Sequence, residues 1–201
     1  SQLNLKDILE FADTVNLEDV RELLETQISY NTAIAEEGLN NFWGASVGRT
    51  ILDAEPGSTL QRARAAAAAG SDARMNGCAL PVVINSGSGN QGITCCMPIV
   101  VYARDLGCSH EQLLRALTLS NLISIHQKRF IGNLSAYCGA VSAGTAAACG
   151  IAYLQGADYD VIGTTIVNAV GTTGGIICDG AKSSCASKIS ASVEALSLIH
   201  I

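Results

Sequence analysis

Two long segments of this sequence carry no charged residue, and they constrain its fold more than any other feature. They cover residues 130–157 and 161–177. A membrane-spanning helix would tolerate such a run, but the first segment is dominated by Gly, Ala, Ser and Thr and lacks the aromatic belt with basic flanks of a membrane span. We therefore expect a buried central helix, in which Gly139, Ala143 and Ala147 let neighbouring helices approach closely. A membrane helix is the less favoured alternative.

Helical patterns extend over much of the remaining chain. Apolar residues recur at intervals of three and four in residues 5–12 and again in residues 20–35, with Gly38 as the expected C-cap of the second helix. The alanine run at residues 65–69 combines the best helix former with a strip of methyl groups, which favours a tight helix interface. Because 48% of the 201 residues are apolar, the chain can fill one core. The sequence predicts a mainly α fold, a compact all-helical domain over residues 1–201.

Composition excludes several kinds of partner. Only 15% of the residues are charged and the net charge is −6, so there is no basic footprint for nucleic acid or an anionic membrane. The eight cysteines do not indicate a disulfide scaffold, because such scaffolds are typically short and secreted, and we expect no signal peptide for this chain. We therefore expect a reducing cytoplasm and a small-molecule partner. A homo-oligomer is compatible with the sequence.

Three cysteines with small neighbours form the most distinctive chemical pattern. Cys138 lies in Tyr-Cys-Gly, and Cys178 and Cys185 enclose a short segment further along the chain. The close C-x2-4-C spacing of a structural zinc site is missing. An iron–sulfur cluster does not need that spacing, and three thiolates on a four-iron cube leave one iron open as a Lewis acid. The pattern by itself is more typical of buried free thiols, and both interpretations stay open.

A loop rich in serine and glycine enters an apolar helix and forms the second pattern. We call it the Ser/Gly loop, and it consists of Ser86, Gly87, Ser88, Gly89, Asn90 and Gln91. Backbone N–H groups at the start of a helix, together with the helix dipole, favour an anion such as a substrate carboxylate. The spacing is neither a Walker loop nor a dinucleotide fingerprint. A loop of this composition is also typical of a plain turn.

These patterns together resemble the L-cysteine desulfidase family, which is related to the alpha chain of the iron–sulfur L-serine dehydratases. The resemblance rests on residues 85–92, 137–145 and 176–185, which occur in the order of the family and lie within a likeness over nearly the whole chain. It implies an oxygen-sensitive lyase with a [4Fe-4S] cluster. It also implies that the Ser/Gly loop holds the amino-acid substrate and that the cluster ligands are Cys138, Cys178 and Cys185.

The resemblance implies β-elimination of L-cysteine to pyruvate, ammonia and hydrogen sulfide. L-serine differs only in the leaving atom and is the alternative substrate. Because a soft thiolate suits coordination to an iron–sulfur cluster, L-cysteine comes first. An alternative from another class is a non-catalytic iron–sulfur sensor or structural subunit.

The sequence does not identify a general base. Ser109 with Gln112 forms a capping-box pattern for a helix that leads to His126, where basic residues commonly complement the helix dipole. Lys182 lies between two of the expected ligands. Either its charge tunes the cluster or holds the substrate carboxylate, or Lys182 is an ordinary surface lysine.

Members of the family are longer than this chain, so we expect it to be part of a longer protein. Its last residues, which include His200, do not resemble the family.

Overall fold

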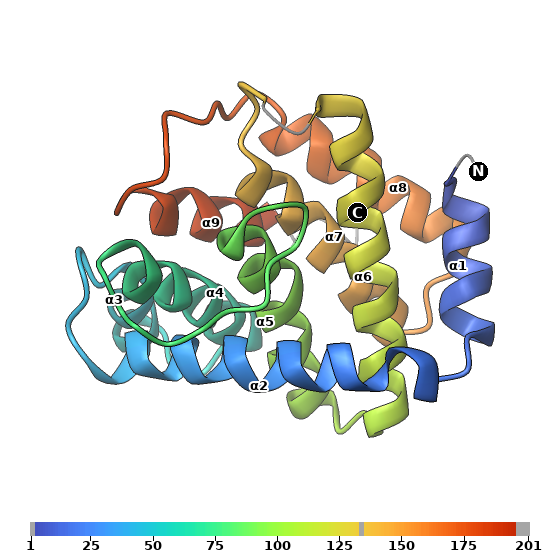
Figure 1. Cartoon of the computed structure of the whole chain (residues 1–201), viewed down its shortest axis with the longest axis horizontal. Helices are drawn as coiled ribbons and strands as arrows, with labels where there is room; N and C mark the ends of the chain where they lie inside the picture. Colours follow the sequence, from blue (N-terminus) through green and yellow to red (C-terminus); the bar gives the residue numbers. More distant parts are fainter. Residues whose placement is uncertain (1–2, 133–134, 196–201) are drawn as a thin grey trace.

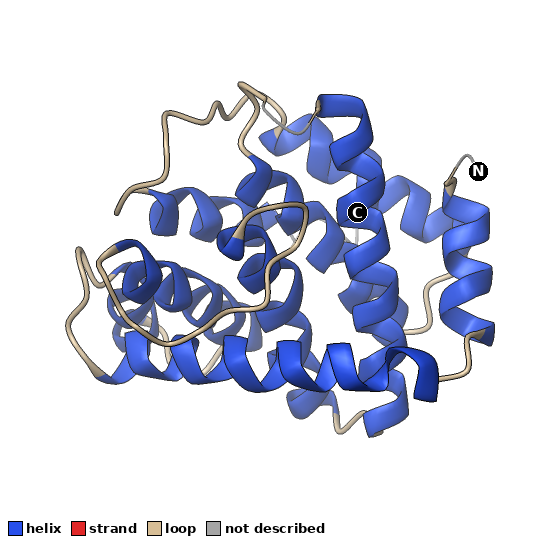
Figure 2. Ribbon diagram, in the orientation of Figure 1, coloured by secondary structure: helices blue, strands red, loops and turns tan. Residues whose placement is uncertain are grey.

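The computed structural model describes residues 3–132 and 135–195, and the described part of the chain contains helices but no strand (Figures 1 and 2). This confirms the expected mainly α, compact all-helical fold. His200 lies outside the described residues. The helices are α1 (Leu5–Thr14), α2 (Glu18–Asn40), α3 (Val47–Ala54), α4 (Thr59–Met75), α5 (Gly89–Leu106), α6 (His110–Ile131), α7 (Gly139–Leu154), α8 (Tyr159–Thr173) and α9 (Cys185–Glu194).

The small-residue helix α7 is the centre of the bundle, as its uncharged sequence predicts. It contacts α5, α6, α8 and α9, and nearly all of its residues are buried. A Cβ atom on Gly144 would lie 2.6 Å from the Ser192 hydroxyl of α9, and one on Gly150 would lie 2.3 Å from Ile99 of α5. Glycine is therefore what allows this close packing. No described helix is both long and apolar enough to cross a membrane.

The alanine run forms the expected tight interface, because α4 packs against α2, α3, α5 and α9. In Figure 1, α2 runs along the lower edge beneath these helices. The prediction that Gly38 caps α2 is wrong, since α2 continues to Asn40. A Cβ atom on Gly38 would lie 2.0 Å from the carbonyl oxygen of Ala69. A Cβ atom on Gly48 of α3 would lie 2.3 Å from the carbonyl oxygen of Ala65. Both glycines serve close approach of helices rather than helix termination.

Local capping signals also place the start of α6. The Ser109 hydroxyl accepts the N–H of Gln112 at 3.2 Å, and the Gln112 side chain accepts the N–H of Ser109 at 2.7 Å, which completes the capping box. This helix carries Asn121, which contacts the segment before the Ser/Gly loop.

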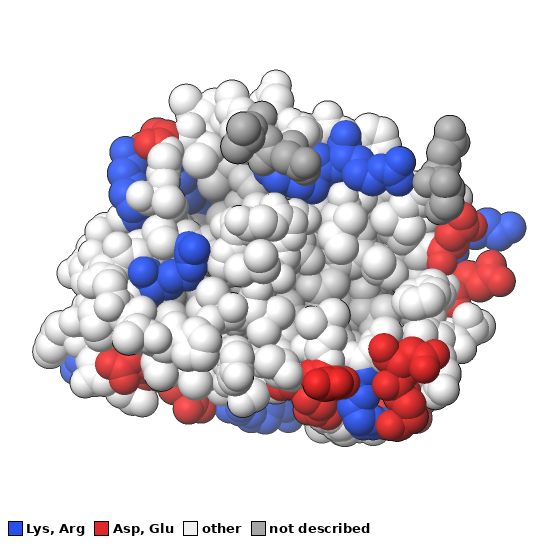
Figure 3. All heavy atoms as spheres, viewed as in Figure 1, with Lys and Arg blue, Asp and Glu red and all other residues white. Residues whose placement is uncertain are grey.

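The segment that leads to the Ser/Gly loop lies on the surface and crosses in front of α5 (Figure 1). Leu80 and Ile84 in this segment are exposed. In Figure 3, the same face is mostly uncharged and its charged side chains gather around the rim. The Ser/Gly loop is therefore presented from an apolar surface segment and continues directly into a buried helix, α5.

Candidate functional site

A short antiparallel bridge joins the segments that carry Cys138 and Cys178. Tyr137 pairs with Ile177, and the N–H of Cys178 donates to the Ala136 carbonyl at 2.6 Å. Because side chains alternate along extended backbone, Cys138 and Cys178 lie on the same face of this pair. They are diagonal neighbours, which in such pairs are about 7–8 Å apart. The bridge thus brings together two cysteines that are distant in sequence.

Cys138 and Cys185 each lie at the start of a helix. Cys138 is the N-cap residue of α7. Cys185 is the first residue of α9, and its sulfur accepts the N–H of Lys182 at 3.5 Å. Helix N-termini favour the negative charge of a thiolate. Two of the three thiols are therefore in positions that suit metal ligation.

The three cysteines form one group, which we call the cysteine site. Burial raises the pKa of the Cys138 thiol, hydrogen bonds from α7 lower it, and the nearby Cys178 and Cys185 raise it further. Cys138 and Cys185 are buried, whereas Cys178 is exposed at the edge of the site. The structure therefore brings together the three cysteines that the sequence singled out.

Within residues 3–132 and 135–195, no group of three or more His, Cys, Asp or Glu residues is arranged to hold one ion. A zinc ion with bonds of about 2.3 Å draws its ligands to one centre. A four-iron cube instead carries thiolate ligands at separate corners, so it accepts the wider spacing across the bridge. Three thiols around one site thus fit the thiolate ligand set of an iron–sulfur cluster.

The first half of the Ser/Gly loop forms a tight turn, and its second half, Gly89, Asn90 and Gln91, is the buried first turn of α5. Asn85 and Ser88 exchange backbone hydrogen bonds of 3.2 and 3.1 Å, and Ser86 and Gly87 between them have φ of 49° and 84°. The Asn85 amide donates to the Asn121 side chain at 2.9 Å, which ties the turn to α6. The loop therefore holds the N-terminus of α5 in a defined place, as an anion site requires.

The end of the Ser/Gly loop meets the cysteine site. A Cβ atom on Gly139 would lie 2.7 Å from the Gln91 side-chain nitrogen, so the Gln91 amide packs against the start of α7 beside Cys138. Asn90 accepts a hydrogen bond from the Arg74 guanidinium at 3.2 Å. Arg74 forms no ion pair with any residue that the structure describes. The two patterns found in the sequence are thus adjacent, and Arg74 adds positive charge next to the loop.

Comparisons with known proteins identify the family of this chain. The sequence model of the serine dehydratase alpha chain family matches residues 3–199. The chain belongs to this family. It is 55% identical to a UPF0597 protein of Desulfitobacterium hafniense (strain Y51), over 96% of the chain and 45% of that relative. It is 54% identical to a UPF0597 protein of Finegoldia magna, over 96% of the chain and 46% of that relative. No solved structure matches the chain.

Membership relates the chain to the iron–sulfur serine dehydratases and confirms the relation that the sequence indicated. The chain spans about half the length of the curated relatives it matches. Desulfidase specificity, the [4Fe-4S] cluster and the individual site residues stay predictions.

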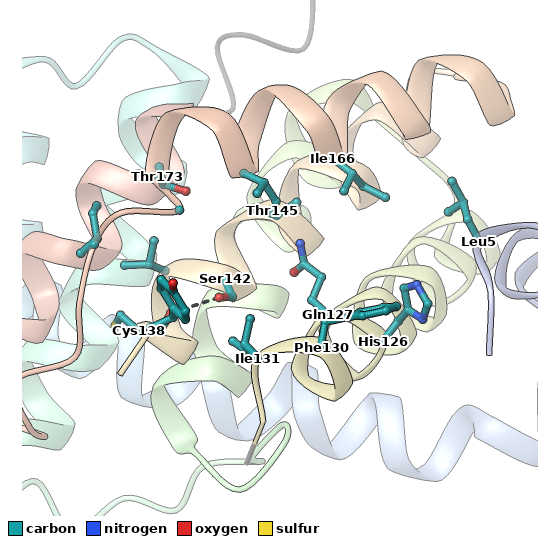
Figure 4. Close-up of a pocket in the computed structure, with 15 residues that line it drawn as sticks. Leu5, His126, Gln127, Phe130, Ile131, Cys138, Ser142, Thr145, Ile166 and Thr173 are labelled. Atoms are coloured by element: carbon teal, nitrogen blue, oxygen red, sulfur yellow. Dashed lines mark hydrogen bonds between the residues drawn. The ribbon is translucent and has the colours of Figure 1, made fainter. Parts of the chain in front are cut away.

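A cavity of about 580 Å³ lies between α6, α7 and α8 and reaches Cys138 at one end (Figure 4). Its lining is mostly apolar, and none of the lining residues belongs to the Ser/Gly loop. The Gln127 side chain points into it, and its oxygen has no partner among the described residues. His126 packs edge-on against Phe130, and burial together with Arg129 lowers the pKa of its imidazole. A zwitterionic amino acid suits the polar loop better than this cavity.

Sequence reasoning missed two basic residues next to the site. Arg74 lies in the last turn of α4 and reaches the Ser/Gly loop, a contact that no local pattern indicates. Lys188 follows Cys185 by one helical turn, which is a spacing that places both on one face of α9. The three-residue spacing from a candidate ligand is visible in the sequence, but it became informative only once the structure showed a helix at Cys185–Glu194.

Proposed function

We propose that residues 1–201 form the iron–sulfur catalytic domain of a β-elimination lyase that converts L-cysteine to pyruvate, ammonia and hydrogen sulfide. The observation that carries this proposal is the convergence of Cys138, Cys178 and Cys185 beside the end of the Ser/Gly loop. Membership in the serine dehydratase alpha chain family supports the reaction class.

In this proposal the three thiolates hold a [4Fe-4S] cluster. Two of them lie at helix N-termini, which stabilise their negative charge. When bound, the cluster would supply an open iron as a Lewis acid for the leaving sulfur or oxygen of the substrate. The exposed side of the site, at Cys178, leaves room for a substrate to approach.

The Ser/Gly loop would bind the substrate carboxylate. The backbone N–H groups at the start of α5 and the positive end of its dipole attract an anion. The Arg74 guanidinium adds a positive charge at Asn90, where no described carboxylate neutralises it. The Gln91 amide, at the end of this loop, packs against Gly139 next to Cys138, so it would orient the amino acid with its β-substituent towards the cysteine site. Such fixed orientation lowers the entropic part of the barrier.

The chemical outcome follows from the bonds broken in the substrate. A base removes the α-proton and hydrogen sulfide leaves from the β-carbon, which gives aminoacrylate. Its imine tautomer takes up water and releases ammonia and pyruvate, so L-cysteine and one water balance the three products. We assign no base within this chain. Its relatives carry about as much sequence again, and we propose that turnover needs that additional part.

L-serine is the second candidate substrate, because the matching family is named for serine dehydratase. The two substrates differ only in the atom that leaves the β-carbon. A soft sulfur favours L-cysteine at an iron–sulfur site. Direct competition between the two amino acids distinguishes them.

The test is anaerobic reconstitution of the chain with iron and sulfide, followed by iron counting and visible and EPR spectra. We expect the wild-type chain and the control Cys149→Ser to load a cluster, and Cys138→Ser, Cys178→Ser and Cys185→Ser to lose it. Addition of L-cysteine should change the spectrum more than L-serine does. Turnover is then measured with a full-length relative, such as the Desulfitobacterium hafniense protein.

Three results would contradict the proposal in different ways. Equal iron loading in all five proteins would overturn the ligand assignment. A folded wild-type chain without iron would return the cysteines to the role of packing residues. A cluster whose spectrum does not respond to either amino acid would favour the non-catalytic sensor instead.

A further inference from the structure

Lys188 contacts both neighbours of Cys178 in the chain. Its ammonium donates to the Ile177 carbonyl at 3.1 Å and forms an ion pair with the Asp179 carboxylate. Cys178 itself lies outside any helix, in the exposed segment between α8 and α9. The Lys188 side chain of α9 therefore contacts the backbone of the residue before Cys178 and the side chain of the residue after it.

The same ammonium lies next to the other two cysteines. Lys188 is three residues after Cys185, so the two side chains share a face of α9. The hydrogen bond to Asp179 is the main cause that raises the pKa of Lys188, and the charges of Cys138 and Cys185 add to it. Lys188 therefore lies near Cys138 and Cys185 as well as next to the neighbours of Cys178.

We propose that Lys188 is a positioning residue that holds Cys178 opposite Cys138 and Cys185. This inference rests on the proposed function and adds to it a residue that acts through the ligands. Cys178 is the one of the three cysteines that does not lie at a helix N-terminus, so its place depends on contacts such as the hydrogen bond from Lys188 to the Ile177 carbonyl.

Lys182 provides a matched control on the same carboxylate. Its ammonium pairs with Asp179 at 2.7 Å, but 51% of its side chain is exposed, compared with 22% for Lys188. It makes no described hydrogen bond to the Ile177 carbonyl. Removing Lys182 therefore removes a charge near the site without removing the contact that spans Cys178.

The first readout uses the metal-free chain and measures amide hydrogen exchange in residues 176–180. We expect Lys188→Met to speed exchange at the Cys178 amide about tenfold, the effect of losing one hydrogen bond to a charged group. Lys188→Arg keeps both contacts and should stay close to wild type. Unchanged exchange in Lys188→Met, or an equal effect of Lys182→Met, would overturn the inference. Urea denaturation of each variant checks that the chain remains folded.

The second readout uses the reconstituted chain and measures iron retained against a chelator together with the reduction potential. Lys188→Met should lose iron faster and shift the potential to more negative values, because a positive charge next to the site has been removed. Lys188→Arg should restore both quantities. Wild-type iron retention and potential in Lys188→Met would overturn the inference while leaving the proposed function intact. A wild-type chain that takes up no iron would contradict the proposed function, and hydrogen exchange would still decide the role of Lys188.

Discussion

Asp72 is a buried carboxylate whose ionisation should be visible in the stability of the chain. It lies in α4 with no exposed surface. One oxygen accepts the N–H of Gly48 at 3.0 Å, and the other has no hydrogen-bond partner among the described residues. Burial raises the pKa of Asp72 from 3.8 to about 6, while hydrogen bonds from Gly48 and Val47 lower it only in part.

The size and sign of the effect follow from these two pKa values. One pKa unit corresponds to about 1.4 kcal/mol, so the shift amounts to about 3 kcal/mol. The folded state binds the proton more tightly than the unfolded state does. The stabilisation by the protonated carboxyl is therefore complete below about pH 4 and is lost as the pH rises through about 6. Above that range the buried charge should destabilise the chain by a constant amount.

The perturbation is Asp72→Asn, which keeps an oxygen that can accept the Gly48 N–H and removes the titration. Urea denaturation of both proteins, followed by circular dichroism from about pH 4 to about pH 8, gives the difference in free energy of unfolding at each pH. We expect this difference to move by about 3 kcal/mol in favour of the variant as the pH rises. Groups shared by both proteins, such as Asp105, cancel in the comparison. A difference that stays the same at every pH would refute the reasoning.

Three further predictions concern packing, capping and thiol reactivity. Gly38→Ala should lower the free energy of unfolding by about 2 kcal/mol, because its Cβ would meet a carbonyl of the alanine run at 2.0 Å; Gly57→Ala, with nothing within 4 Å, is the control and should be near neutral. Ser109→Ala should cost about 1 kcal/mol through loss of the capping box, and no change in urea denaturation would contradict this. Iodoacetamide should label the exposed Cys178 in the native chain and leave Cys149, which is fully buried and has a raised thiol pKa, unlabelled until unfolding; mass spectrometry reads out both, and early labelling of Cys149 would show that the core is open.

The helical class and several helix ends could be predicted because they depend on neighbours in the chain. The capping box at Ser109 uses two residues that are three positions apart. The uncharged run of small residues predicts that α7 is buried, however the other helices pack around it. Gly38 shows the limit of this reasoning. A glycine after a helical pattern usually marks a C-cap, but here it allows α2 to approach the backbone of α4, which no local signal reveals.

The sequence by itself determined the elements and the candidate groups: a helical chain, three cysteines with small neighbours and a Ser/Gly loop that begins a helix. Only the tertiary structure decided which of these meet. The bridge that joins the segments of Cys138 and Cys178, the contact of Gln91 with Gly139 and the reach of Lys188 to Ile177 all link residues from different elements. Such contacts depend on how the helices pack around α7, and packing is set by the shapes of all surfaces together rather than by any one segment.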